Sequence, residues 1–338
     1  MADRVLITGI SGFLGGHVAL QLLNAGYTVR GSLRHLSRAD SVRQTLSRAG
    51  ADTTRLDFVA LDLLRDEGWH EATRDCRFVQ HIASPLLTTI PADPMVLIAP
   101  AVEGTERALA AANSAGVERI VVTSSMAAIA YGHDRARTAP FTAAEWTDLS
   151  GRNINAYQQS KTLAERRAWA IMDAAGRQDA LATINPGVIL GPLLDSDSGT
   201  SAVLVQRLLN RTIPALPRTS IAAIDVRDVA AAHVAAMTSA SAGGQRFPMS
   251  ERPLWAAEMA RIVRQAYPHY PVPRLQVPDW AARLYGAFNR DIGRGLGELG
   301  LVRQLDSSAA IALLGRALIP VPDAILATAQ SLINHKLA

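Results

Sequence analysis

The sequence predicts an α/β protein: a doubly wound parallel sheet with a smaller, mostly helical C-terminal lobe. Three observations lead to this prediction. Short apolar runs alternate with helical periods over most of the chain, a glycine-rich turn follows the first run, and the alternation stops after Ser250. Alternating strands and helices of this kind form right-handed βαβ units around a parallel sheet.

The expected elements follow the chain in order. Strands are expected near 4–8, 28–33, 56–61, 78–82, 119–123, 182–185 and 246–249, and the main helices near 12–24, 96–114, 156–175 and 226–238. The composition of residues 239–244 predicts a turn and a loop, and after Ser250 we expect short helices separated by prolines. We therefore assign 1–185 and about 221–249 to a dinucleotide-binding domain, and about 186–220 with 250–338 to a substrate-binding lobe.

The segment 286–300 contains five glycines. It fits a mobile lid over the substrate and, equally well, a loosely packed surface connection.

Bulk properties exclude several classes of protein. A hydrophobic content of 49% with 19% charged residues is typical of a globular chain. The net charge of +4 comes without a basic stripe, so nucleic acid is not an expected partner. The single cysteine, Cys76, excludes an internal disulfide, and no apolar run is long enough for a membrane span or has the pattern of a signal peptide. We expect a cytoplasmic monomer or homodimer that contacts no membrane and holds no metal.

Three glycines at three-residue spacing follow the first strand and open a helix. Gly9 allows a tight turn, Gly12 lets the backbone approach a pyrophosphate, and Gly15 allows close packing of helix on sheet. The free N–H groups at the helix start would then face the phosphates. This Rossmann-type turn predicts a dinucleotide site formed by Gly9, Ser11, Gly12, Phe13, Leu14 and Gly15.

Tyr157 and Lys161 form the second informative pair. Lysine occurs only twice in the chain, at Lys161 and Lys336, so a lysine four residues after a tyrosine is an unusual coincidence here. The spacing places both side chains on one face of a helix. An ammonium beside a phenol lowers its pKa and makes it a proton donor near neutral pH. The alternative is an incidental pair on a helix surface.

These motifs resemble the extended short-chain dehydrogenase/reductase family. The resemblance is strongest to its branch of dihydroflavonol reductases, cinnamoyl-CoA reductases and microbial ketone and aldehyde reductases. It runs from about Arg4 to Ser331 and is most specific at the segments 9–15, 81–85, 121–125, 157–161, 185–188 and 224–228.

The resemblance implies further site residues. Ser125 would be the second donor to the substrate carbonyl, with Ser124 as its rival. Asp62 and Leu63 would contact the adenine, although Asp62 could equally cap a turn. The loop that holds Ala83 and Ser84 would pass under the nicotinamide ribose, and Pro186, Gly187 and Val188 would touch the nicotinamide. His81 is expected to be a core histidine without a catalytic role.

The second strand ends without the acidic residue that binds the ribose hydroxyls of NAD. It is followed instead by Arg34, where the similar reductases hold the 2′-phosphate, and by Arg38 one turn later. This predicts NADPH, or NADP, as the cofactor. The alternative is that both arginines merely solvate a helix start.

The candidate substrate walls are almost all apolar. They are Leu86, Leu87, Met126, Ala127, Ile154, Val188, Leu190 and Leu204, with Tyr285 and Phe288 from the lobe. Because they include no arginine or lysine, they indicate a neutral, partly aromatic ketone or aldehyde. Each could equally belong to the core.

The sequence thus predicts an NADPH-dependent carbonyl reductase. Tyr157 would give the proton, Lys161 would lower the tyrosine pKa and hold the ribose, and Ser125 would steady the carbonyl oxygen. The alternatives are a sugar-nucleotide epimerase or dehydratase, a hydroxysteroid-type dehydrogenase, and a non-catalytic NADP-binding sensor. The arginines argue against the epimerase, which prefers NAD, and the complete Tyr/Lys pair argues against the sensor.

Overall fold

The computed structural model describes residues 2–84, 93–196, 199–288 and 296–338. Its larger sheet has seven parallel strands in the order β3-β2-β1-β4-β5-β6-β9. These strands are β1 (Arg4–Thr8), β2 (Thr28–Leu33), β3 (Leu56–Ala60), β4 (Phe78–His81), β5 (Arg119–Thr123), β6 (Leu181–Pro186) and β9 (Gln245–Met249). Each predicted strand is present to within one residue at either end, and the predicted Rossmann-type fold is confirmed.

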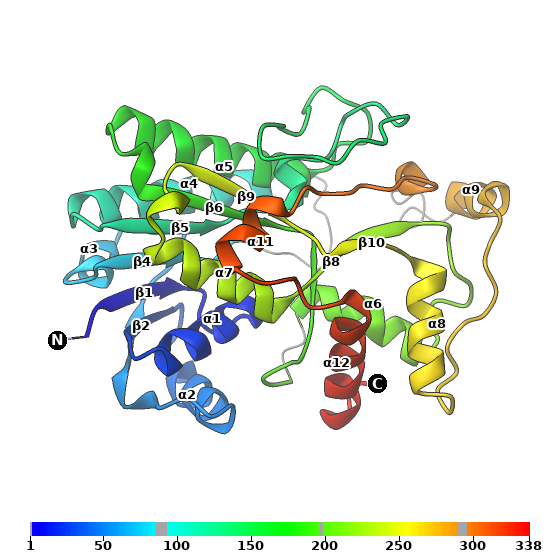
Figure 1. Ribbon diagram of the computed structural model, residues 1–338, viewed down its shortest axis with the longest axis horizontal. Helices are drawn as coiled ribbons and strands as arrows, with labels where there is room; N and C mark the ends of the chain where they lie inside the picture. The colour runs from blue at the N-terminus through cyan, green and yellow to red at the C-terminus, as the bar shows by residue number, and fades with distance from the viewer. Residues whose placement is uncertain (1, 85–92, 197–198, 289–295) are drawn as a thin grey trace.

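Helices cover both faces of this sheet, because successive residues of a strand point to opposite sides. Val5 and Ile7 pack with α1 (Phe13–Asn24), α2 (Ala39–Arg48), α7 (Val226–Thr238) and α11 (Ser308–Leu314). Leu6 packs on the other face, with α3 (Trp69–Thr73), α4 (Met95–Ser114) and α5 (Ala156–Ala174). Figure 1 shows α4 and α5 on one side of the sheet and α1, α2 and α7 on the other.

The strand order reverses between β1 and β4. From β1 the chain runs to β2 and β3 on one side, then crosses to β4, β5 and β6 on the other. In open parallel sheets a ligand binds at such a switch point, beyond the carboxyl ends of the strands. The glycine turn after β1 and the loops after β4 and β5 therefore meet at one edge.

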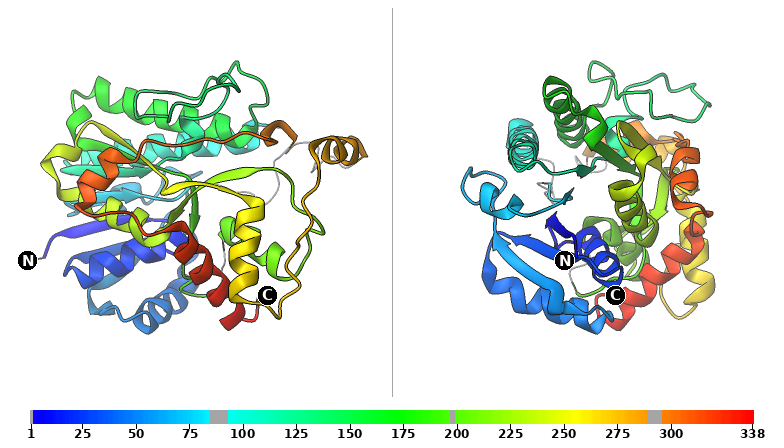
Figure 2. Two further views of the ribbon diagram at one scale, coloured as in Figure 1. Left: turned by 45° about the vertical axis from the view of Figure 1, so that its right-hand side comes forward. Right: turned by 60° about the vertical axis from the view of Figure 1, so that its left-hand side comes forward.

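A second, smaller sheet has the order β10-β8-β7. Its strands are β7 (Val188–Leu190), β8 (Ser220–Asp225) and β10 (Arg252–Trp255), and it packs with α6 (Gly199–Leu209), α8 (Ala256–Ala266) and α12 (Val321–Asn334). With α9 (Asp279–Phe288), these elements lie at the end of the molecule away from the N-terminus (Figures 1 and 2). The 3₁₀ turns are η1 (Leu36–Arg38), η2 (Thr53–Arg55), η3 (Met126–Ala128), η4 (Gln178–Ala180), η5 (Ala240–Ala242) and η6 (Leu296–Glu298).

The two parts interleave more than the sequence predicted. Residues of β8 were assigned to the dinucleotide-binding domain, but this strand belongs to the smaller sheet. In the other direction, α11 packs against α7 and β9, and Ala310 and Leu318 join the core of the larger sheet. Of the glycine-rich segment 286–300, residues 289–295 lie outside the described residues. Within the described ranges, no helix is both long and apolar enough to cross a membrane.

Candidate active site

The glycine turn between β1 and α1 forms an open cradle. Gly9 has φ +77°, and a Cβ there would lie 3.0 Å from the backbone of Ala83. A Cβ at Gly15 would lie 2.1 Å from the carbonyl oxygen of Gly9, so this glycine lets the helix approach the turn. A Cβ at Gly12 would meet only the Gly9 oxygen, at 3.4 Å. Because α1 begins without a capping side chain or an acidic residue in its first turn, its N–H groups can receive a pyrophosphate.

The end of β2 presents two arginines to solvent. Arg34 follows the strand directly, and Arg38 caps the N-terminus of α2. Neither guanidinium has a partner among the residues that the structure describes. A cation is normally unfavourable at a helix N-terminus. An anion bound between these arginines, such as a 2′-phosphate, would offset that cost.

The loops after β3 and β4 lie beside the glycine turn. Oδ1 of Asp62 accepts a hydrogen bond of 3.0 Å from the N–H of Leu64, which is the turn-capping role. Ala83 donates its N–H to Thr8, which joins the end of β4 to the end of β1. His81 is buried, its Nδ1 lies 3.0 Å from the Thr8 hydroxyl, and burial lowers its pKa to about 3. His81 is therefore a neutral core histidine, as predicted.

Val188 and its neighbours form the turn between β6 and β7. A Cβ at Gly187 would lie 2.1 Å from the carbonyl oxygen of Ala222 on β8. The φ of Gly187 is not in the left-handed region, so the reason for glycine is instead the close approach of two strands.

A capping box fixes the first turn of α5. Oδ1 of Asn155 accepts from the N–H groups of Tyr157 and Gln158 at 3.0 and 3.1 Å, and Oε1 of Gln158 accepts from the N–H of Asn155 at 2.8 Å. This arrangement satisfies donors that the helix itself leaves unpaired. The backbone of Tyr157 is therefore positioned independently of its hydroxyl.

Ser125 meets Tyr157 at the end of β5. The Ser125 side chain lies close enough to the Tyr157 hydroxyl to favour its ionised form and so oppose the rise in its pKa. The Ser125 Oγ accepts from the N–H of Ala127 at 3.1 Å, which holds the serine in place at the start of η3. The structure thus brings the predicted acid and the predicted second donor together.

The pKa values of the pair differ from the expectation. Burial raises the pKa of Tyr157, and the nearby Ser125 side chain opposes this shift. Burial also lowers the pKa of Lys161 to about 8, against a favourable effect of Glu165. The prediction that the neighbouring ammonium lowers the pKa of Tyr157 is therefore corrected: burial disfavours the charged forms of both groups, and the pKa of the tyrosine is raised. Within the described residues Nζ of Lys161 has no hydrogen-bond partner, so its donors remain available to a ribose.

Glu165 is a residue of the site that the sequence analysis missed. Its carboxylate is fully buried and accepts from five side chains, one of them Nε1 of Trp169 at 3.4 Å. The Ser124 hydroxyl and Nδ2 of Asn185 (2.7 Å) donate to Oε2, while the Thr183 hydroxyl (3.1 Å) and Nε of Arg246 (2.6 Å) donate to Oε1. Glu165 thus ties α5 to β5, β6 and β9. Its place four residues after Lys161, on the same helix face, was the signal that could have revealed it.

This network separates the two candidate serines. The hydroxyl of Ser124 is engaged by Glu165, whereas that of Ser125 faces Tyr157. The geometry therefore favours Ser125 over Ser124 as the donor to a substrate.

The predicted substrate walls are only partly described. Leu86 and Leu87 lie outside the described residues, and so do the side chains of Tyr285 and Phe288 in α9. Met126, Ala127 and Leu190 are buried, and Leu190 packs in the core of the lobe rather than lining a surface. Ile154, Val188 and Leu204 are half-buried.

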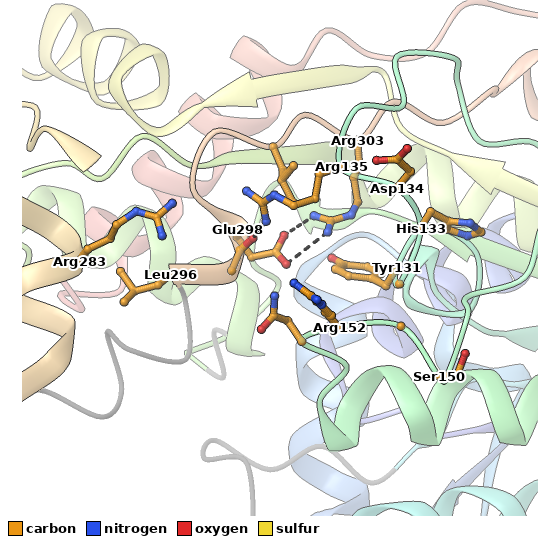
Figure 3. Close-up of a pocket in the computed structure, with 15 residues that line it drawn as sticks. Tyr131, His133, Asp134, Arg135, Ser150, Arg152, Arg283, Leu296, Glu298 and Arg303 are labelled. Carbon is orange, nitrogen blue, oxygen red and sulfur yellow. Dashed lines mark hydrogen bonds and ion pairs between the residues drawn. The ribbon is translucent and has the colours of Figure 1, made fainter. Parts of the chain in front are cut away.

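A cavity of about 700 Å³ opens instead beside Tyr131 (Figure 3), and none of the predicted wall residues lines it.

The fold and the site together define a class of protein. It is an oxidoreductase that binds a dinucleotide at the switch point of its sheet and holds Ser125, Tyr157 and Lys161 at the same edge. The model of the NAD dependent epimerase/dehydratase family matches residues 5–248. The chain belongs to this family, the extended short-chain dehydrogenases/reductases, as its motifs predicted.

Individual relatives are reductases. The chain is 34% identical over 287 residues to cinnamoyl-CoA reductase CAD2 of Medicago truncatula, covering 83% of this chain and 85% of the relative. It is 35% identical over 269 residues to cinnamoyl-CoA reductase 1 of Oryza sativa, covering 79% and 77%. Among solved structures, the yeast methylglyoxal/isovaleraldehyde reductase Gre2 in complex with NADPH superposes with a TM-score of 0.82 at 25% identity, over 98% of this chain and 99% of the other.

Proposed function

We propose that this protein reduces the carbonyl group of a small ketone or aldehyde to an alcohol with NADPH, and catalyses the reverse oxidation at the same site. The observation that carries the proposal is the proximity of the Ser125 and Tyr157 hydroxyls at the edge of the sheet where the dinucleotide cradle opens. Lys161 stands one helical turn from Tyr157 with its donors unused.

The enzyme class and the cofactor rest on the relatives as well as on the residues. The chain is an NADP-dependent oxidoreductase: its relatives are named reductases, and the Gre2 structure holds NADPH. The unpaired guanidinium groups of Arg34 and Arg38 fit the 2′-phosphate that distinguishes NADP from NAD.

Each group of the chain has a separate task in this mechanism. The bound cofactor supplies the hydride. The N–H groups at the start of α1 hold its pyrophosphate, and Lys161 donates to its ribose hydroxyls. Tyr157 donates a proton to the carbonyl oxygen, and the Ser125 hydroxyl gives that oxygen a second hydrogen bond as negative charge develops.

The carbonyl-bearing end of the substrate is proposed to be neutral and partly aromatic. The apolar candidate walls that are half-buried, Ile154, Val188 and Leu204, support this. The relatives' names, which include cinnamoyl-CoA and isovaleraldehyde, point to aromatic or branched carbonyl compounds.

The test follows NADPH absorbance with purified protein and a panel of aromatic and branched aldehydes and ketones. Wild-type protein should oxidise NADPH in the presence of the carbonyl compounds, while Tyr157→Phe should lose about 10²-fold or more in turnover and keep its affinity for NADPH. Arg34→Ala should weaken the binding of NADPH by roughly 10- to 100-fold and leave the affinity for NADH unchanged. Two results would instead support the epimerase alternative. One is that the protein uses NADPH and NADH equally well, and the other is that it keeps NAD bound and oxidises no NADPH.

A further inference from the structure

The cavity beside Tyr131 is lined mainly by polar and charged side chains. Four arginines contribute to it, Arg135, Arg152, Arg283 and Arg303, against the two carboxylates of Asp134 and Glu298. In Figure 3, Arg283 and Leu296 lie on one side of the cavity and Tyr131 and His133 on the other. The lining therefore carries a net positive charge, unlike the apolar walls predicted for the substrate.

One lining residue of the cavity, Tyr131, lies near the catalytic groups. Tyr131 lies six residues after Ser125 and packs in the same small core as Met126. Arg152 lies five residues before Tyr157, just ahead of the capping box of α5. Tyr131 is also close enough to Tyr157 for the two hydroxyls to interact electrostatically. A ligand held beside Tyr131 would therefore have one end near Tyr157.

The walls of the cavity are held in place by their own contacts. Arg135 donates to the carbonyl oxygens of Gly297 and Leu299 at 2.6 and 3.0 Å. Arg303 pairs with Glu298, donates to the Ala130 carbonyl at 2.8 Å, and stacks over Tyr131 at 4.1 Å from the ring centroid. These contacts join the segment after Ser125 to the segment 296–303.

Two guanidinium groups of the lining, those of Arg152 and Arg283, do not take part in these contacts. Within the described residues, Arg152 and Arg283 form no hydrogen bond or ion pair. Arg283 interacts electrostatically with Asp279, but that carboxylate already pairs with Arg218. Glu298 is already neutralised by Arg303, and Asp134 is exposed and caps its own turn through the N–H of Ala136. The carboxylates of the lining therefore do not satisfy these arginines.

We propose that this cavity binds an anionic group, a carboxylate or a phosphate, at the end of the substrate distant from the carbonyl. The inference rests on the reductase function proposed above and specifies its substrate class: an apolar carbonyl-bearing body with an acidic tail. Arg152 and Arg283 are the specificity-determining residues for that tail. Both are exposed, so their attraction for an anion is screened by salt.

The test uses matched substrates that differ only in charge. 4-Formylbenzoate and 4-formylcinnamate are compared with their methyl esters, in initial rates of NADPH oxidation at low ionic strength. The acids should have the higher kcat/KM, through a lower KM. The double variant Arg152→Ala/Arg283→Ala should lower the acid-to-ester ratio by about tenfold, with kcat and ester turnover unchanged. Raising the salt concentration should lower the wild-type ratio in the same direction.

A matched control removes the same charge elsewhere. Arg48→Ala/Arg261→Ala changes two exposed arginines on α2 and α8, so its ratio should equal that of the wild type. Three results for the acid-to-ester ratio of kcat/KM would overturn the inference. The ratio could fall equally in both double variants, it could stay unchanged in both, or it could favour the esters already in the wild type. Parallel loss of acid and ester turnover would also overturn it, since it would show a structural role. If the wild type reduces neither compound of any pair, the proposed reaction itself fails and this inference fails with it.

Discussion

Ser124 and Ser125 are adjacent, yet their hydroxyls have different surroundings. Ser125 meets Tyr157 and accepts from Ala127, whereas Ser124 donates to the buried carboxylate of Glu165. From the sequence alone the two could be distinguished only by resemblance, because a strand-end serine can cap a loop as readily as it can bind a substrate.

Alanine substitutions should therefore separate a catalytic from a structural serine. Ser125→Ala should lower kcat by about 10²- to 10³-fold with little effect on melting temperature, as for the loss of one donor to an oxyanion. Ser124→Ala should lower the free energy of unfolding by about 1 kcal/mol and change kcat only mildly. Steady-state kinetics and urea unfolding of both variants provide the measurement, and the reverse ranking in kcat would move the catalytic role to Ser124.

Lys161 is expected to lower the stability of the fold. Its pKa is about 8 in the folded chain, below the ordinary value of 10.5, so between these values the unfolded chain binds more protons. Below pH 8 the buried Lys161 lowers the free energy of unfolding by its full amount, and this effect disappears as the pH rises towards 10.5. Lys161→Met should thus be more stable than the wild type at pH 7, by about 3 kcal/mol, and inactive.

The measurement for Lys161 is chemical unfolding of both proteins from pH 7 to pH 10.5. The stability difference should shrink as the pH rises across this window. A difference that is independent of pH would show that the lysine keeps its ordinary pKa in the fold.

At the scale of elements, α5 is held against the sheet by the ion pair of Glu165 and Arg246. Arg246 comes from β9, is 8% exposed, donates to the carbonyl oxygens of Ala143 and Glu145, and stacks on Trp146 at 3.8 Å. The last strand of the larger sheet, the loop before α5 and the catalytic helix are therefore joined by two side chains. The position of Tyr157 depends on all three.

Replacing one partner of the Glu165–Arg246 pair should destabilise the fold more than replacing both. Glu165→Gln leaves Arg246 buried without a counter-charge, so it should lower the free energy of unfolding by about 3–5 kcal/mol. Adding Arg246→Met should recover part of that loss, because no buried charge remains unpaired. A double-mutant cycle by urea unfolding measures the coupling. Additive effects of the two substitutions would show that the pair does not act as a unit.

Elements differ in how well the sequence predicts them. The strands of the larger sheet have five or six residues, with one exception of four, and the helices that flank them keep a regular period. By contrast, β7 has three residues and β10 has four, including Pro253, so neither contains a full alternation of burial. Their pairing with β8 depends on contacts distant in sequence, which no local pattern contains.

At the scale of the whole molecule, Asp228 connects the two parts. It is fully buried at the start of α7, accepts from the N–H of Ile319 at 2.6 Å, and pairs with Arg316 at 2.6 Å. The segment that leads from α11 to α12 is thereby fixed to the larger sheet. The contacts of Asp228 with Arg316 and Ile319 therefore give it a structural role.

Asp228→Ala should destabilise both parts together. It leaves a backbone donor without its acceptor, so we expect a loss of about 1–3 kcal/mol and a single cooperative transition, whereas Asp228→Asn keeps an acceptor oxygen and should lose less. Thermal unfolding followed by near- and far-ultraviolet circular dichroism tests this. Two separate transitions would show that the lobe unfolds independently.

The crossing of the chain between the two sheets also limits how this enzyme can be recombined with its relatives. Residues 226–249 return from the smaller sheet to the larger one, and α11 returns a second time before α12 closes the lobe. A graft of a foreign substrate lobe at one junction would therefore exchange part of the nucleotide scaffold with it. A chimaera that keeps the scaffold intact needs a junction at every crossing, with the partners of Asp228 retained on the native side.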